Sequence, residues 1–329
     1  MPKLLLAAFN DKSTGGFIDS IARSGILKSR VGYFLFNIFY KKWLFGRIRS
    51  VDTVSGTDIL LLGLPIPLSY LRLINPICLE RSILRICREN ECAGYFVPMG
   101  AKKEGCFGTS TDTRGIRSIA FRSLLLPMLE KIYAGSGARL DNIDIVFAHE
   151  GDHALVTALI GQIEPQVKFI RVAAKDARDM EAQLSDICDE TGIAVQVDSD
   201  YKKALRGADL VICTGSANGL RGCRVDANTI VIDYSDGGLA GLRGDFQHIK
   251  GIAYDFPKGL YSRLGEDVAR SYEKSELTDI LMMLKTGLIP GRQSGGDAME
   301  KVSAVFKAEG CRIKGFIGRR GTIVKFRAG

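Results

Sequence analysis

The chain has 329 residues and a formal net charge of +8, with 46% hydrophobic and 25% charged residues. These values are ordinary for a soluble globular protein and leave room for two domains with sizeable cores. Apolar runs stay below the roughly 18–20 uncharged residues that a membrane-spanning helix needs, so we expect no such helix.

Eight cysteines are scattered along the chain without a Cys-x-x-Cys pair. Cys87, Cys92 and Cys106 lack a nearby histidine that would complete a zinc site. We therefore expect reduced, mostly buried thiols and a cytoplasmic location. The apolar N-terminus shows no small-residue cleavage site, so it predicts a first strand instead of a signal peptide.

Aromatic and basic side chains are mixed in residues 30–49. One interpretation is an amphipathic element that rests on a membrane surface, making the protein peripheral to the membrane, or that meets an acyl chain or an acidic carrier protein. The other interpretation is a helix buried in the core of an N-terminal domain.

A second basic stretch, at residues 312–327, contains no acid and is typical of a solvated tail, with an anionic partner as the alternative. Because no known nucleic-acid-binding motif accompanies it, we do not expect a nucleic acid as that partner. The sequence also leaves open whether the chain forms a homo-oligomer.

Predicted strands and helices alternate in the first half. A buried strand begins at Asp58 and ends in the Pro-rich turn at residues 65–67. Apolar spacing then predicts a helix over 76–89, a strand over 93–97 and one long helix over 115–133. This half therefore predicts an N-terminal α/β domain.

The second half alternates more regularly. It predicts strands at 143–148, 167–173, 193–197, 208–214, 229–233 and 249–254, and helices at 154–163, 177–191 and about 200–206. This order predicts a Rossmann-like, doubly wound, mainly parallel sheet. Residues 257–285 and 297–309 are predicted to be helical. We expect an N-terminal substrate or partner domain over 1–135, the Rossmann-like domain over 136–256, and C-terminal helices with a basic tail over 257–329 that return to the N-terminal domain.

The turn after the strand at 143–148 stands where a dinucleotide-binding domain keeps its glycine loop. Phe147, Glu150 and His153 occupy the places of glycines, and only Gly151 is left. Glu150 and Asp152 also put negative charge where a phosphate would meet a helix N-terminus. The candidate cofactor residues here are Ala148, His149, Glu150 and Gly151.

Two further turns complete the candidate cofactor site. Thr214, Gly215 and Ser216 follow a buried strand and offer hydroxyls and a close backbone at the crevice of the sheet. Lys175 and Arg178 follow the second strand, where cations favour the 2′-phosphate of NADP over NAD. A solvated helix start explains the two cations equally well.

His149 and His153 formally match His-Glu-x-x-His, a pattern of zinc sites on helices. That chemistry needs one regular helix through all five residues, whereas Gly151 and the strand-to-turn location argue against a helix. The alternatives are a polar ligand-binding turn and a loop without a ligand. Asp233, at the end of a later strand, is a candidate base, with turn formation as the alternative.

The order of short motifs resembles the predicted amino-acid dehydrogenase family that includes long-chain acyl-carrier-protein reductases of cyanobacteria. The motifs are Leu-Gly-Leu-Pro-Ile-Pro at 62–67, Ala-Gly-Tyr-Phe-Val-Pro at 93–98, Asp-Asn-Ile-Asp-Ile-Val at 141–146, the Thr-Gly-Ser turn at 214–216, Val-Ile-Asp-Tyr at 231–234, the segment 260–268 and Ala-Glu-Gly-Cys at 308–311. The resemblance covers roughly residues 50–315 and rests on pattern and order. It implies a substrate domain and a Rossmann domain that delivers hydride from NADPH to a thioester.

The sequence departs from that family at two places. One is the glycine loop. The other is the motif that carries the family's acylated cysteine, since Arg263 stands in its place between Tyr261 and Glu266. Arginine cannot act as a nucleophile, so the family's covalent route is not expected here. Tyr261, Glu266 and Asp233 are the remaining catalytic candidates.

The sequence leaves two functions open. The first is a dehydrogenase-like protein that uses NADP as an oxidoreductase on an acyl or carbonyl substrate. The alternative is a non-catalytic Rossmann-like protein that binds another ligand or a protein partner. Fold analogy cannot choose between them, because function depends on the site.

Overall fold

The computed structural model describes residues 3–9, 48–54, 57–64, 76–98, 101, 114–134, 137–150, 153–215, 219–235, 239, 241–264, 266–288, 296–319 and 323–324. The chain divides into two compact units. The first consists of residues 1–116 and 256–292, and the second of residues 117–255 and 293–329. The aromatic and basic segment lies almost entirely outside the described residues.

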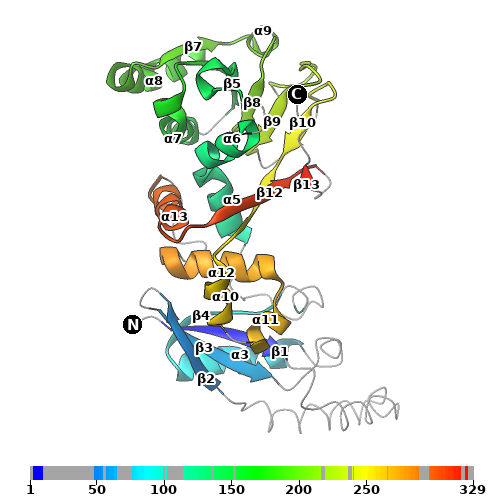
Figure 1. Cartoon of the computed structure of the whole chain (residues 1–329). Helices are drawn as coiled ribbons and strands as arrows, with labels where there is room; N and C mark the ends of the chain where they lie inside the picture. The colour runs from blue at the N-terminus through cyan, green and yellow to red at the C-terminus, as the bar shows by residue number, and fades with distance from the viewer. Residues whose placement is uncertain are drawn as a thin grey trace, which may run out of the picture. The chain divides into compact units, whose positions relative to one another are not determined.

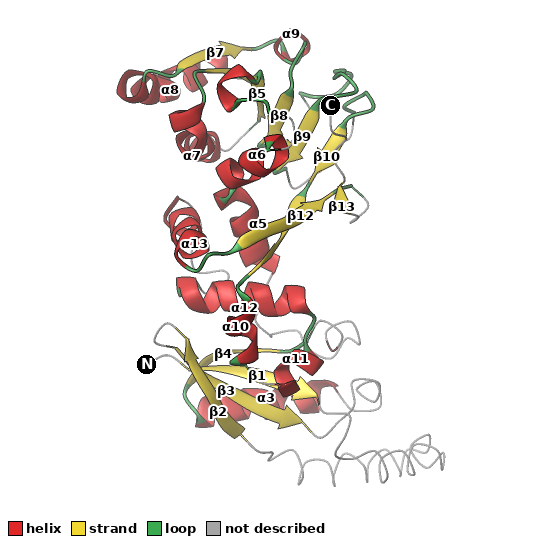
Figure 2. Cartoon of the chain, in the orientation of Figure 1, coloured by secondary structure: helices red, strands yellow, loops and turns green. Residues whose placement is uncertain are grey.

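The first unit contains a mixed four-stranded sheet with the order β2-β3-β1-β4 (Figures 1 and 2). Its strands are β1 (Lys3–Phe9), β2 (Ile48–Val54), β3 (Thr57–Leu64) and β4 (Cys92–Phe96). Strand β1 runs parallel to β3 and β4, and β2 runs antiparallel to β3. Helix α3 (Pro76–Glu89) precedes β4 at the bounds that the apolar spacing predicts.

The stretch 257–285, which the sequence predicts to be helical, forms three helices in the same unit. They are α10 (Lys258–Ser262), α11 (Glu266–Ser271) and α12 (Lys274–Thr286). A capping box starts α12, because Glu273 and Glu276 each bond the other's backbone N–H. The residues from Glu276 to Leu284 are buried, so α12 is a core helix of this unit.

The second unit contains six parallel strands in the order β10-β9-β8-β5-β6-β7. They are β5 (Ile145–His149), β6 (Phe169–Ala174), β7 (Ala194–Asp198), β8 (Leu210–Cys213), β9 (Ile230–Asp233) and β10 (Gln247–Ile249). Counted from β5 as the first strand, this is the order 3-2-1-4-5-6 of a dinucleotide-binding Rossmann sheet. The α/β, doubly wound fold that the sequence predicts is confirmed.

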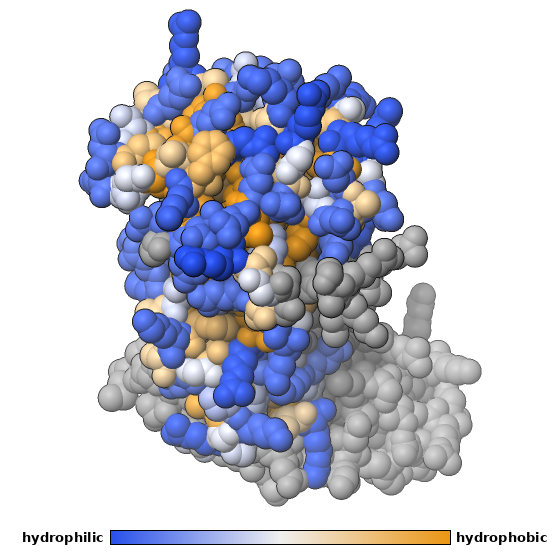
Figure 3. Space-filling view, turned by 45° about the horizontal axis from the view of Figure 1, so that its top comes forward, coloured by the Kyte–Doolittle hydropathy of each residue, from blue (hydrophilic) through white to orange (hydrophobic). Residues whose placement is uncertain are grey.

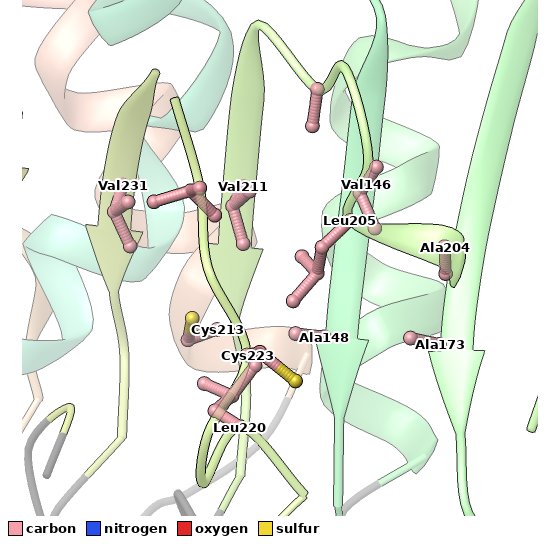
Figure 4. Close-up of a cluster of buried hydrophobic side chains, with 12 residues drawn as sticks. Val146, Ala148, Ala173, Ala204, Leu205, Val211, Cys213, Leu220, Cys223 and Val231 are labelled. Atoms are coloured by element: carbon pink, nitrogen blue, oxygen red, sulfur yellow. The ribbon is translucent and has the colours of Figure 1, made fainter. Parts of the chain in front are cut away.

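Helices α7 (His153–Ile163), α8 (Ala177–Thr191) and α9 (Tyr201–Ala204) connect these strands. Every residue of β5, β8 and β9 is buried, which explains why these strands read as unbroken apolar runs. On one face of the sheet, Val146, Val211 and Val231 pack with Leu205, Leu220 and Cys223 (Figure 4). This core fixes the ends of the central strands, where the candidate site lies.

The prediction of one long helix over 115–133 is wrong in one respect. This stretch forms two helices, α5 (Arg114–Ser123) and α6 (Leu125–Tyr133). Leu124 between them has φ −119° and ψ 30°, outside the helical region. Pro127 supplies the reason: it has no N–H, and its ring would clash with the carbonyl of Ser123 in a continuous helix.

The predicted strand over 249–254 is also two elements. Strand β10 ends at Ile249 and belongs to the parallel sheet, whereas β11 (Gly251–Asp255) belongs to a separate antiparallel sheet with β12 (Arg312–Ile317) and β13 (Ile323–Val324). The basic C-terminal stretch is therefore not simply a tail. Arg312 and Lys314 occupy the exposed positions of β12, and Lys314 pairs with Asp255 at 3.7 Å. Helix α13 (Gly296–Ala308) precedes β12.

The side chains exposed on the face shown in Figure 3 are mostly hydrophilic, with apolar ones between them. Among the described residues, the large apolar side chains with high exposure are Ile77, at 57%, and Phe169, at 43%. Within the described part of the chain, helices that combine the length and the apolar character of a membrane span are absent.

Candidate functional site

The candidate site lies at the carboxyl edge of the six-stranded sheet. From β5 the chain proceeds through α7 to β6 and β7 on one side, and β8, β9 and β10 lie on the other side. The strand order therefore reverses between β5 and β8. In open α/β sheets, ligands bind outside the carboxyl ends of the strands at such a point. The residues that end β5 and follow β8 are His149, Glu150, Thr214 and Gly215.

His149 and Thr214 connect the two central strands. Nδ1 of His149 lies 3.0 Å from Oγ1 of Thr214, and the backbone N–H of Thr214 donates to the carbonyl of Ala148 at 3.1 Å. Both side chains are buried, with exposures of 2% and 4%. The imidazole is thus held in a fixed orientation at the reversal point.

His153 begins α7 beside His149, and the two ring centroids are 4.8 Å apart. His149 is a strand residue, so the pair does not have the helical i, i+4 geometry of a His-Glu-x-x-His site. Within the described residues, no group of three or more His, Cys, Asp or Glu side chains is placed to hold a metal ion. The described residues therefore provide no third ligand for a metal ion held by His149 and His153.

Gly215 lies against the backbone of Glu150. A Cβ atom at position 215 would lie 1.7 Å from the Glu150 carbonyl oxygen and 2.6 Å from its backbone nitrogen. Position 215 therefore requires glycine, and the turn after β5 is packed directly on the turn after β8. Gly151 and Ser216, which the sequence adds to this site, lie outside the described residues.

Tyr201, the first residue of α9, covers the turn after β5. Its hydroxyl donates a hydrogen bond to the carbonyl of His149, and a Cβ at Gly219 would lie 2.6 Å from its ring. Burial, helped by the negative charge of Glu150, raises the pKa of Tyr201 to about 12. Sequence reasoning missed this role, because Tyr201 follows the third strand and reaches back to the first.

Lys175 and Arg178 follow β6, and both side chains are exposed. Asp176 lies between them, also exposed, at the N-cap position of α8 without a capping bond from its side chain. The edge after β6 thus offers two cations and one carboxylate to a ligand.

Asp233 ends β9 and is buried, with 6% exposure. Its Oδ1 accepts bonds from the backbone N–H and the hydroxyl of Ser235, and its Oδ2 lies 3.1 Å from Nε2 of His248 on β10. This geometry forms the turn that the sequence offers as the alternative to a catalytic base, and it also positions His248, a histidine that sequence reasoning left without a role. The neighbouring Cys213 is buried, and burial raises the pKa of its thiol, so it is not set up as a nucleophile.

Tyr261 belongs to the first unit. Its hydroxyl lies 2.7 Å from Oγ1 of Thr278 and accepts a bond from the N–H of Phe256 at 3.1 Å, while Nζ of Lys274 lies 5.3 Å from its ring centroid. Glu266 begins α11, and its side chain lies outside the described part. Arg263, at the C-cap of α10, is exposed.

Neither a family model nor a curated protein sequence matches this chain. Solved structures that align with it include ornithine carbamoyltransferase from Pyrococcus furiosus, at 11% identity over 89% of this chain and 86% of that chain, with a TM-score of 0.29. L-Tryptophan dehydrogenase from Nostoc punctiforme aligns at 11% identity over 94% and 80%, with a TM-score of 0.28. Dipicolinate synthase from Bacillus subtilis aligns at 9% identity over 87% and 98%, with a TM-score of 0.32. Such low values carry no argument about function, and the Rossmann-like fold rests on the strand order.

Proposed function

We propose that this chain is a dehydrogenase-like protein, an NAD(P)-dependent oxidoreductase that acts on an acyl or carbonyl substrate. The observation that supports the proposal most is the 3-2-1-4-5-6 order of the parallel strands, with the hydrogen-bonded pair His149 and Thr214 at the point of reversal. A dinucleotide binds at that point in proteins with this strand order.

The described residues fit the adenosine end of a dinucleotide better than its pyrophosphate. After β6, the exposed side chains of Lys175 and Arg178 suit a 2′-phosphate, whereas Asp176 suits the ribose hydroxyls. After β5, the space beside Gly215 holds the backbone of Glu150 and not an open cradle. A bound nicotinamide would supply or accept the hydride.

The chain's own residues take the remaining roles. His149, held by Thr214, would hold or release a proton at its imidazole, and Tyr201 keeps the turn after β5 in place through the His149 carbonyl. Arg263 excludes an acylated side chain at its position, because a guanidinium stays protonated. The proposed reduction therefore proceeds on a substrate that is not covalently attached there.

The second candidate is a non-catalytic Rossmann-like protein that binds another ligand or a protein partner. Two observations favour it, namely the packing of Glu150 on Gly215 and the replacement of the loop glycines by Phe147 and His153. Both reduce the space and the backbone freedom that a pyrophosphate needs.

The test is a calorimetric titration of the purified protein with NADPH and NADH at low salt, where charge contributes most to binding. We expect saturable, micromolar NADPH binding that weakens at least tenfold when Lys175 and Arg178 are both replaced by alanine. Lys168→Ala is the matched control, because Lys168 is also exposed but precedes β6 at the opposite end of the strand. Absence of binding at millimolar NADPH and NADH would overturn the oxidoreductase proposal and leave the second candidate.

A further inference from the structure

An open cavity of about 660 Å³ lies at the amino end of the six-stranded sheet, opposite the edge that carries His149 and Thr214. Its walls come from the end of α6, the segment before β5, the segment before β6, and the end of α8. The volume falls within the range of small-molecule sites, roughly 300–1,000 Å³. The cavity lies entirely within the second unit.

The charges around the cavity do not balance. Arg139 makes a two-point ion pair with Asp141, with Nε–Oδ1 and Nη2–Oδ2 distances of 3.2 and 2.9 Å. Glu130 accepts a hydrogen bond from Gln166 at 3.1 Å. Glu164 and Lys168 make no hydrogen bond or ion pair with another side chain in the part of the chain that the structure describes. Three carboxylates thus face two cations, a formal charge of −1.

Two helix ends add to this negative charge. Residues at the C-terminal ends of α6 and α8 line the cavity, and the C-terminal end of a helix carries roughly half a negative charge. Cations are favourable in the last turn of a helix, and α6 carries Lys131 there. In contrast, α8 has no cation in its last turn and carries Asp189 and Glu190. In a chain with a net charge of +8, the end of α8 is therefore a local negative site without a basic residue in its last turn.

The cavity also has an apolar part, formed by Leu140, Val167 and Ile193, each between 4% and 8% exposed. A metal ion would leave these side chains unused. A molecule with positive groups on an aliphatic body matches both parts. We propose that this cavity binds an organic polycation of the linear polyamine class, with ammonium groups at Glu164 and at the C-terminal end of α8 and methylene groups against the apolar wall.

The experiment is a calorimetric titration with spermidine at low salt, on the wild-type protein and three variants. We expect saturable binding that Glu164→Gln weakens about fivefold, the value of one partly exposed ion pair of about 1 kcal/mol. Lys168→Ala should strengthen binding, because it removes a like charge from the cavity. Glu181→Gln is the matched control, since Glu181 is exposed on α8, ten residues before the cavity-lining Thr191.

Three results would overturn the proposal. The first is no saturable binding up to millimolar spermidine. The second is equal affinity of the Glu164→Gln and Glu181→Gln variants, which would show diffuse attraction to acidic residues. The third is weaker binding by the Lys168→Ala variant, which would indicate an anionic ligand. Thermal unfolding of each variant checks that it is folded, so that a lost affinity reports on the cavity.

Discussion

The carbonyl of Glu150 lies where the side chain of any residue larger than glycine would begin at position 215. The two turns at the point of strand reversal are therefore packed backbone to backbone. This contact connects the first and fourth strands of the parallel sheet at their carboxyl ends. Any ligand at this edge has to accommodate the paired turns as they stand, or separate them.

The first prediction concerns this contact. Gly215→Ala should lower the free energy of unfolding by about 2 kcal/mol or more, because a methyl group cannot be placed without moving the Glu150 backbone. Urea unfolding followed by circular dichroism measures the change.

Gly161→Ala is the control, because Gly161 lies within α7 with open space at its Cβ position. The same substitution there should stabilise the protein by about 0.5–1 kcal/mol through helix propensity. Equal effects at the two positions would contradict the packing of Gly215 on Glu150.

The second prediction concerns the pH dependence of stability. The pKa of Tyr201 is raised to about 12 from an ordinary value of 10. A group with a raised folded-state pKa contributes its stability below its unfolded pKa and loses it as the pH rises to the folded one. The stability difference between the wild type and Tyr201→Phe should therefore be constant below pH 10 and should narrow between about pH 10 and 12.

Urea unfolding of both proteins at pH 8, 10 and 11 measures this difference. Other buried tyrosines titrate in both proteins, so their contribution cancels in the comparison. A difference that stays constant up to pH 11 would mean that burial and the charge of Glu150 do not raise the pKa of Tyr201 in the folded protein.

Local pattern predicted most of the elements of this fold. Helices α3 and α8 have the bounds that the sequence indicates. Their apolar positions recur at helical spacing, and residues that terminate a helix follow them. Gly192, with φ 73°, ends α8 in the left-handed conformation that glycine adopts at little cost. The alternation of strands and helices was enough to predict the doubly wound sheet.

Contacts between distant residues were not predictable in this way. The break at Leu124 follows from Pro127, three residues later, whose effect the apolar periodicity alone does not show. The separate roles of β10 and β11 depend on pairing with β9 and with β12, which one apolar run cannot show. Tyr201 and His248 reach the site edge across 52 and 15 residues. In the sequence, Tyr201 and His248 are isolated residues. Neither belongs to a periodic pattern that would assign it to the site.

The third prediction tests the pair of Asp233 and His248. Asp233→Asn, His248→Gln and the double variant form a double-mutant cycle in the free energy of unfolding. Because Asp233 is buried and His248 is mostly shielded, with side-chain exposures of 5% and 12%, we expect an interaction energy of about 1 kcal/mol or more. Additive effects of the two substitutions would show that the pair is not coupled, and that Asp233 acts only through the turn to Ser235.

The fourth prediction concerns the break between α5 and α6. The side-chain carbonyl of Gln162 accepts a bond from the N–H of Leu125 at 3.0 Å, and its amide donates to the carbonyl of Arg122 at 2.9 Å. Gln162 thus replaces helical bonds that the break removes. Gln162→Leu keeps the size of the side chain but leaves both backbone groups without this partner, so we expect a loss of about 2 kcal/mol.

Gln183→Leu is the control for that substitution, because Gln183 is exposed on α8 and bridges no helix ends. Its effect should stay within about 0.5 kcal/mol, as for most surface positions. Hydrogen exchange then separates a local from a global effect: the amide of Leu125 should exchange faster in the Gln162→Leu variant than the loss of global stability explains. Unchanged protection of that amide would show that water or a neighbouring group takes over from Gln162 at the break.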